Sequence, residues 1–440
     1  MVAAKPATLA SLFSILRRTV DDETRFTAGK AIFNLLVTDE TRELAVSADV
    51  VPVLRDLVVP APRTPVGETN SLVQVTPEVP QESTVHCANA LFLLSRHETS
   101  RASLLKHKAL RVVVDLCTSS TDENAKLSCA RALMMLAWHK ETCAELATAG
   151  ALPALVRLVD TSGKTAEAVR QSCTRALCNL SLYTADGGAT RRQMIEAGVV
   201  RAAVKLFSHT QAHEVEARTS LGMTVRCLAS TLADGDCADG AADAFDDGAV
   251  ALLVQLAKEN AAGSEELQQD CAVALCDLAL CEDLSERLVR GGAHKSLMDV
   301  AAATKSEETR WRCAAALRFL SAKPANCSAL IRAGCVKSVV GMCFGPTADS
   351  DKQKLSSAVL APTLSECAAA LCALSSVTVN AERAQVVSEG AVPLLIELSH
   401  SDDDGVVSNC SVGLSNLSSA STAVDVSACC LCCWRATFVC

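Results

Sequence analysis

The 440-residue sequence predicts an all-α fold made of stacked helical repeats, and three observations lead to this prediction. One nine-residue phrase recurs along the chain with the spacing of a helix face, and a second phrase that begins with Gly comes before most of its copies. Half of the residues are apolar but only 3% are aromatic, so Ala, Leu, Val and Cys must fill the interior. Small side chains of this kind suit closely packed helices, and a repeat array can lengthen without forming separate cores.

The first phrase occurs in nine copies, with a basic period of about 42 residues. In CARALMMLA, for example, Cys129, Ala132, Leu133 and Leu136 are small or apolar and lie on one face of a helix. The phrase therefore predicts a long, buried helix in each repeat. The copies begin at Ala28, Cys87, Cys129, Cys173, Leu221, Cys271, Cys313, Cys367 and Cys410.

The second phrase predicts a turn followed by another helix. Its Gly ends a short helix, and the apolar run after the Gly begins an amphipathic helix. Each repeat is therefore expected to contain a short helix, a Gly turn, a second helix, a polar turn and the long helix. The phrase begins at Gly150, Gly198, Gly248, Gly292, Gly334 and Gly390.

These paired phrases resemble the armadillo repeat, whose pattern is G-A-hydrophobic-P-x-L-V followed by A-A-x-A-L-x-N-L-S. The segment from Gly150 to Ser181, GALPALVRLVDTSGKTAEAVRQSCTRALCNLS, matches that pattern nearly throughout. The resemblance covers about residues 8 to 420 and implies an armadillo-type solenoid, a right-handed α-α superhelix with about nine repeats over residues 1–420. HEAT repeats share the helical period but usually lack the Gly phrase, so they are the structural alternative.

Several segments depart from the repeat. Residues 59–82 form a Pro-rich insertion and residues 345–364 a polar one, and both are expected to be loops. Residues 233–247 are read as an acidic turn. The last segment, 421–440, is a Cys-rich tail that we expect to be disordered. It has no His for a zinc site, and palmitoylation of its clustered cysteines is the alternative to disorder.

The cysteines before the tail are expected to be reduced thiols. Seven of the nine long-helix phrases begin with Cys, always at the same inward position. Free Cys is among the most buried residue types and packs as a small hydrophobe. Disulfides across the stack are therefore not expected.

The sequence gives no support for catalysis. It has no G-x-S-x-G elbow, phosphate-binding loop or dinucleotide-binding motif. His209 and His213 have the spacing of a zinc pair, but Thr210 stands where the catalytic Glu would be. The chain is therefore predicted not to be an enzyme and to bind no cofactor or metal.

Composition also limits the partners and the location. A net charge of -9 and a pI near 5.5 argue against nucleic acid as a partner. No stretch approaches the roughly 18 apolar residues of a membrane span, so no transmembrane segment is expected. We expect a cytoplasmic protein, with the nucleus as a second location.

The resemblance implies that the protein binds an extended segment of another protein along a concave groove lined by the long helices. In the family, the Asn of A-L-x-N-L holds the peptide backbone, and importin-alpha-like members have a Trp four residues earlier. None of the corresponding positions here is Trp, which argues against a nuclear import receptor. The predicted groove residues are Lys30, Asn34, Asn89, Arg131, Arg175, Asn179, Asp277, Phe319 and Asn416.

The predicted groove differs in character along the chain. Its amino-terminal residues are polar or basic, whereas the later positions are mostly apolar. Arg131 and Arg175 occupy equivalent places in adjacent repeats and should project side by side, where they can pair with carboxylates. We therefore expect the amino-terminal half to prefer an acidic, extended segment.

The leading hypothesis is a non-catalytic scaffold or adaptor, and two alternatives stay open. The first is a membrane-recruited adaptor resembling vacuolar armadillo proteins, which would depend on the Cys-rich tail. The second is the substrate-binding part of a larger protein such as a ubiquitin ligase, in which armadillo arrays are joined to a catalytic module.

Overall fold

The computed structural model describes residues 6–18, 21–58, 81–161, 167–183, 185–233, 241–259, 265–344 and 361–418. These residues form 25 α-helices and one 3-10 helix, and they contain no β-strand. The predicted all-α, armadillo-type fold is confirmed. The chain divides into two compact units, Met1–Thr224 and Val225–Cys440, which are taken in turn.

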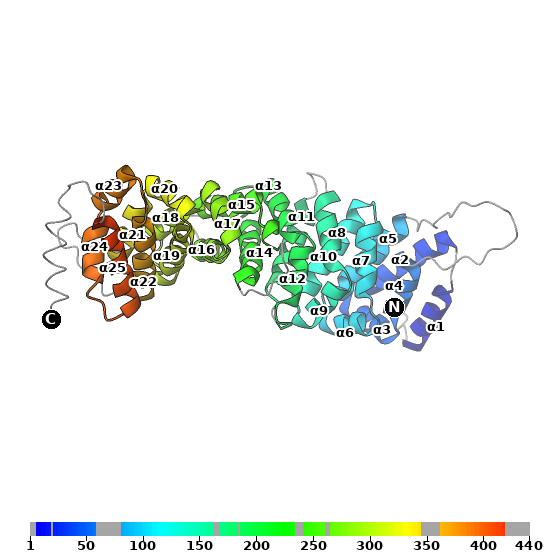
Figure 1. Cartoon of the computed structure of the whole chain (residues 1–440). Helices are drawn as coiled ribbons and strands as arrows, with labels where there is room; N and C mark the ends of the chain where they lie inside the picture. The colour runs from blue at the N-terminus through cyan, green and yellow to red at the C-terminus, as the bar shows by residue number, and fades with distance from the viewer. Residues whose placement is uncertain are drawn as a thin grey trace, which may run out of the picture. The chain divides into compact units, whose positions relative to one another are not determined.

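The first unit contains four long helices in consecutive contact and the start of a fifth. The long helices α2, α5, α8 and α11 pack each against the next, with shorter helices between them (Figure 1). Its helices are α1 (Pro6–Leu16), α2 (Asp22–Leu36), α3 (Asp39–Ser47), α4 (Val50–Val58), α5 (Gln81–Ser95), α6 (Glu98–Lys106), α7 (Leu110–Ser119), α8 (Glu123–Ala137), α9 (Lys140–Thr148), α10 (Ala151–Thr161), α11 (Glu167–Ser181), α12 (Ala189–Glu196), α13 (Val199–His209) and the first part of α14 (Val215–Ala233).

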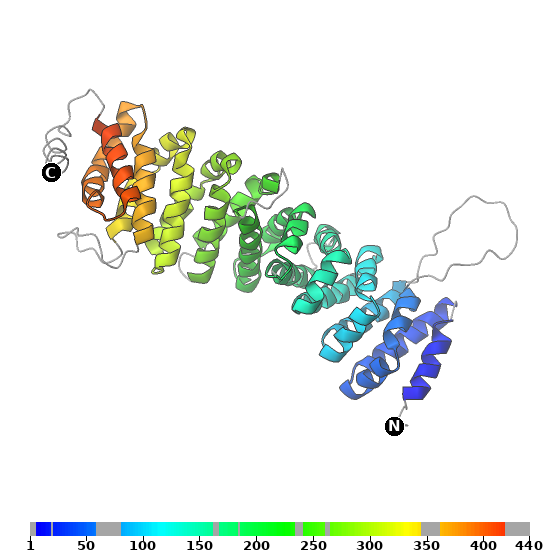
Figure 2. The ribbon, with the colours of Figure 1, turned by 60° about the horizontal axis from the view of Figure 1, so that its bottom comes forward.

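The second unit begins within α14, at Val225, and repeats the pattern. Its long helices α16, α19, α22 and α25 are again in consecutive contact, and Figure 2 shows them side by side from green to red. Its further elements are η1 (Ala241–Ala244), α15 (Asp247–Glu259), α16 (Glu265–Ala279), α17 (Glu282–Arg290), α18 (Ala293–Ala303), α19 (Glu307–Ala322), α20 (Pro324–Arg332), α21 (Cys335–Phe344), α22 (Ala361–Ser375), α23 (Asn380–Ser388), α24 (Ala391–Leu398) and α25 (Asp404–Ser418).

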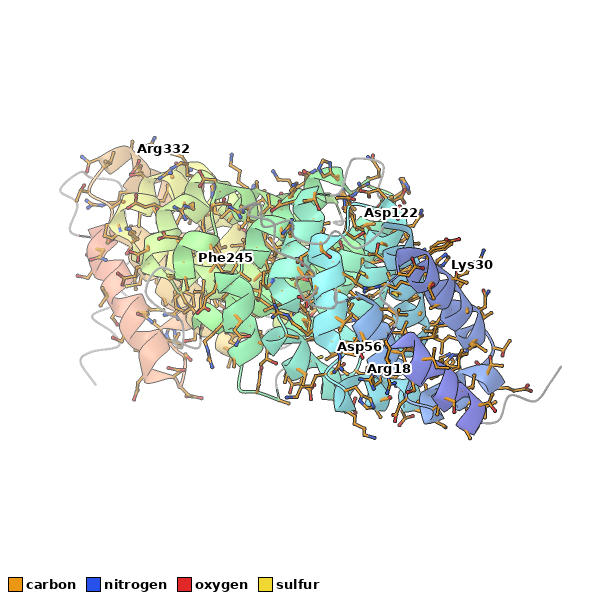
Figure 3. The ribbon with its side chains drawn as sticks, turned by 90° about the vertical axis from the view of Figure 1, so that its right-hand side faces the viewer. Arg18, Lys30, Asp56, Asp122, Phe245 and Arg332 are labelled. Atoms are coloured by element: carbon orange, nitrogen blue, oxygen red, sulfur yellow. The ribbon has the colours of Figure 1, made fainter. Side chains whose placement is uncertain are left out.

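The long helices bury the face that the sequence predicts. In α8, Cys129, Ala132, Leu133 and Leu136 are at most 1% exposed. The helix begins where the side chain of Asp122, labelled in Figure 3, accepts hydrogen bonds from the first free backbone N–H groups. Local capping and the apolar stripe therefore specify the same helix.

The Gly turns are confirmed in five of the six predicted places. Their φ angles lie between 80° and 91°, a region that side chains disfavour, and the second helix begins directly after each Gly. These glycines are Gly150, Gly198, Gly292, Gly334 and Gly390.

The prediction for Gly248 is wrong, because this residue lies in the first turn of α15. Asp246 accepts a hydrogen bond from the backbone N–H of Ala249 at 3.0 Å and so starts the helix before the Gly. Within the described residues 241–246, no short α-helix precedes Gly248. The 3-10 helix η1 precedes it instead and is followed by Phe245, labelled in Figure 3, whose ring is fully buried. The described part of the acidic stretch 233–247 is thus more ordered than a solvated turn.

Two further turns adopt the same backbone conformation without Gly. Asp49, before α4, has φ 61°, and Lys108, before α7, has φ 51°. Both stand at the place that Gly occupies in later repeats. These two turns were not predicted, because Gly was the only sequence signal for such a turn.

The two predicted insertions end earlier than expected. Helix α5 begins at Gln81, within the Pro-rich insertion 59–82, and α22 begins at Ala361, within the polar insertion 345–364. Polar residues fit an exposed first helical turn as well as a loop, so composition could not place these boundaries. The Cys-rich tail 421–440 lies outside the described residues.

The cysteines of the described residues are all free thiols, and only Cys281 and Cys372 are not buried. Burial raises the pKa of the Cys87 and Cys173 thiols from 9.0 to about 12. A thiol with such a pKa stays protonated at neutral pH and is a poor nucleophile. The predicted role of these residues as small core side chains is therefore confirmed for the part of the chain described.

Candidate partner-binding surface

The candidate surface is formed by two rows of side chains on the long helices. The first row contains the third residue of each phrase, and the second row contains the residue four positions later, so both lie on one helix face. We call this the long-helix surface.

Among the described residues no helix is long and apolar enough to cross a membrane by itself.

In the first unit the structure places six predicted residues on this surface. Lys30 and Asn34 of α2, Arg131 of α8 and Arg175 of α11 are exposed. Asn89 of α5 and Asn179 of α11 are partly exposed. Figure 3 labels Lys30 on α2. Because the four helices are in consecutive contact, the first row forms a polar and basic strip that Asn34 and Asn179 border at its two ends, whereas Leu93 and Met135 occupy the second row between them.

In the second unit the three predicted residues are less accessible. Asp277 on α16 is only 7% exposed. Phe319 on α19 is partly exposed, and the guanidinium group of Arg318 lies 4.1 Å from the centre of its ring. Asn416 on α25 donates a hydrogen bond to the hydroxyl of Ser375 at 3.1 Å. These side chains are thus largely engaged within the unit itself.

The two arginines that are predicted to bind an acidic segment are not equivalent. Arg175 forms an ion pair with Glu216 of α14, and both side chains remain more than half exposed. For Arg131, no carboxylate among the described residues lies within ion-pairing distance. Exposed ion pairs contribute little, so Glu216 competes only weakly for Arg175. Arg131 is therefore the more available cation.

Neighbouring long helices are also joined by contacts between side chains near their middles. Arg226 of α14 pairs with Asp270 of α16 at 2.8 Å, and Arg318 of α19 pairs with Glu366 of α22. Burial raises the pKa of Asp270, and the guanidinium group of Arg226 opposes this rise. Each pair joins the sixth residue of one phrase to the residue just before the next phrase.

Two hollows open on or beside the long-helix surface of the first unit. One, of about 290 Å³, is lined by Trp138, Lys140, Asn179, Leu182 and Tyr183, among others. The other, of about 340 Å³, lies at the Arg175 and Glu216 ion pair, and its further lining residues are Gln171, His213, Glu214, Val215 and Ala217. The predicted groove residues Asn179 and Arg175 thus each border a hollow.

The family model for the armadillo/beta-catenin-like repeat matches residues 380–419. This is the ninth repeat, in which α23, α24 and α25 follow one another with the Gly390 turn between the first two. This segment belongs to the armadillo repeat family, and the chain has an armadillo-type fold. A search of the curated proteins found no match.

One solved structure agrees with the fold of this chain. The crystal structure of an engineered protein is 22% identical, covers 97% of this chain and 92% of its own, and has a TM-score of 0.56. A designed armadillo repeat protein is 20% identical, with 70% and 99% coverage and a TM-score of 0.36. Another, in complex with the peptide (KR)4, is 19% identical, with 70% and 99% coverage and a TM-score of 0.35.

Two features of this surface were not predicted from the sequence: the ion pairs between neighbouring long helices and the exposed Trp138. The pairs Arg226–Asp270 and Arg318–Glu366 could have been predicted from the sequence, because an acidic residue directly precedes the phrases at Cys271 and Cys367. The position of Trp138 on this surface could also have been predicted, because Trp138 lies seven residues after Arg131 and hence on the same helix face.

No cluster of three or more His, Cys, Asp or Glu side chains suited to a metal is found among the described residues. His209 ends α13, and His213 is exposed in the following loop, on the hollow beside Arg175.

Proposed function

We propose that this protein is a non-catalytic scaffold that binds an extended segment of a partner protein along the long-helix surface, and that the first unit prefers an acidic segment. The observation that carries the proposal is the exposed polar and basic strip from Lys30 to Asn179. Its residues come from the first and second rows of four consecutive repeats. Stacked repeats of this kind form extended binding surfaces.

The chemistry of the strip supports an acidic, extended partner. The carboxamides of Asn34 and Asn179 each offer donors and an acceptor, which suit the N–H and C=O groups of a peptide backbone. The guanidinium groups of Arg131 and Arg175 suit carboxylates, which they can bind through two parallel hydrogen bonds. Each such pair contributes about 1 to 3 kcal/mol where it is partly desolvated.

The test is a charge reversal of Arg131 and Arg175 to Glu in the full chain. A pull-down with mass spectrometry identifies the partner, and its affinity is then measured for each variant. We expect the double variant to bind at least about tenfold more weakly, because two favourable charge pairs become repulsive. The melting temperature should barely change, since both side chains are exposed.

Two control variants sharpen this test. Arg157→Glu combined with Arg201→Glu makes the same charge change at exposed residues of α10 and α13, away from the long-helix surface, and should leave binding unchanged. Glu216→Gln removes the competitor of Arg175 and should strengthen binding slightly. Equal affinity of the Arg131 and Arg175 double variant and the wild type would show that this strip is not the binding site.

A further inference from the structure

The long-helix surface has a third row, and four of its eight described positions carry a large apolar side chain; the other four are Arg96, Ser230, Ala322 and Ser376. An exposed large apolar side chain directly follows four long helices, nine residues after the start of the phrase. These are Val37, Trp138, Leu182 and Leu280, which are 54%, 72%, 45% and 43% exposed. The third row lies seven residues beyond the first row and therefore on the same helix face. Its recurrence distinguishes it from scattered exposed apolar residues, which are common.

In the first unit, two members of this row meet around one hollow. Trp138 follows α8 and Leu182 follows α11, and both line the hollow of about 290 Å³. Tyr183, the only tyrosine of the chain, lines it as well. Pockets for whole small molecules span roughly 300 to 1,000 Å³, so a hollow of this size suits a single side chain.

Polar groups around this hollow can orient a peptide backbone and supply positive charge. Asn179 of the second row lines it, and so does Lys140, the first residue of α9. Arg131 lies two helical turns before Trp138 on the same face of α8. A peptide backbone held by Asn179 would place a neighbouring side chain against the indole, with Lys140 at the hollow and Arg131 farther along α8.

We propose that this hollow binds one large apolar side chain of an acidic, extended segment of a partner protein. This inference rests on the proposed function and adds to it the residue that anchors the segment. The indole, the phenol ring and the Leu182 side chain form the apolar walls. Tryptophan and tyrosine are enriched among the residues that dominate binding energies at interfaces, particularly where the surroundings exclude water. Lys140 and Arg131 pair with carboxylates that flank the anchor.

The test uses two labelled peptides and the full chain. Both are short, acidic and extended, with Asp, Glu, Ser and Gly throughout, and they differ at one central residue, which is Phe in one and Ala in the other. We expect the Phe peptide to bind about tenfold more tightly than the Ala peptide. Trp138→Ala should abolish this preference, whereas Trp138→Phe should keep most of it.

Matched variants separate the hollow from general apolar exposure. Leu280→Ala truncates the same row in the second unit and should leave the Phe preference unchanged. Trp138 is 72% exposed, so Trp138→Ala should retain the wild-type melting temperature. A Phe preference that survives in Trp138→Ala, or equal affinity of the two peptides for the wild type, overturns the inference.

The failure of this inference can be told apart from failure of the proposed function. If Arg131→Glu weakens both peptides and neither is preferred, the basic strip binds acidic segments and the hollow has no anchoring role. If neither peptide binds, the inference falls, and the proposed function is decided by the partner from the pull-down. If the wild type self-associates in sedimentation and Trp138→Ala does not, the hollow is covered by a second copy, and the inference is overturned.

Discussion

At the residue scale, the turn between the first two helices of a repeat requires a backbone conformation that only Gly adopts without strain. Five repeats have Gly there, whereas Asp49 and Lys108 adopt a positive φ with a side chain present. A left-handed conformation costs a non-glycine residue about 1 to 2 kcal/mol. The first repeats of the chain therefore fold despite local strain that the later repeats avoid.

We predict that Lys108→Gly stabilises the first unit. The substitution removes the left-handed strain, and the greater entropy of Gly in the unfolded chain offsets part of the gain. The net increase in the free energy of unfolding should be about 0.5 to 1 kcal/mol. Urea unfolding followed by circular dichroism measures it.

The reverse change supplies the control. Gly150 has φ 89°, and a Cβ there would meet Val114 and Arg111 only at ordinary contact distances. Gly150→Ala should therefore destabilise through the backbone alone, by about 1 kcal/mol. A destabilised Lys108→Gly variant would mean that the Lys108 side chain itself contributes to the turn.

At the scale of the element, each long helix depends on its start as well as on its apolar face. Asp122 caps α8 by accepting hydrogen bonds from the N–H groups of Asn124 at 2.8 Å and Ala125 at 3.0 Å. Ser306 caps α19 in the same way, through the N–H of Thr309 at 3.2 Å. A helix N-terminus without such a partner leaves its first N–H groups to water.

We predict that Asp122→Ala destabilises α8 and its neighbours by about 1 kcal/mol, because the cap is lost. Hydrogen exchange should show faster exchange in α8, and the urea midpoint should fall. Asp115→Ala is the matched control, since Asp115 makes only an exposed ion pair with Arg111 and should change stability by less than about 0.5 kcal/mol. Equal effects of the two variants would argue against the capping role.

At the scale of the whole molecule, the buried cysteines contribute to the stability of every repeat whose long-helix phrase they begin. Burial holds the pKa of Cys87, Cys173 and Cys335 at about 12, above the ordinary value of 9.0. The folded chain therefore keeps these thiols protonated at a pH at which the unfolded chain loses the protons. This contribution to stability is complete below pH 9.0 and is lost as the pH rises toward about 12.

We predict that the free energy of unfolding falls above pH 9, by about 1 kcal/mol per buried thiol at pH 10. Urea unfolding at a series of pH values from neutral to alkaline measures the slope. A variant with Cys87→Ala and Cys173→Ala should lose less stability over the same interval, whatever its stability at neutral pH. If the slope is unchanged in this variant, groups other than these thiols cause the loss of stability at alkaline pH.

The repeat units, the buried face of each long helix, most turns and the burial of the cysteines were determined by the sequence itself. The reason is that helix period, caps and Gly turns are local properties, repeated about every 42 residues. The non-Gly turns at Asp49 and Lys108 were not predictable, because nothing in their residue types marks a left-handed backbone.

Only the tertiary structure decided which of the predicted groove residues are exposed for binding a partner. Arg131 and Arg175 look alike in the sequence, yet Glu216 pairs with Arg175 alone. Asp277 is buried although its place in the phrase matches that of exposed Asn34. The hollow at Trp138 likewise depends on Leu182, 44 residues away. Such contacts depend on how neighbouring repeats pack, and no local pattern of residues encodes the packing between units so far apart in the chain.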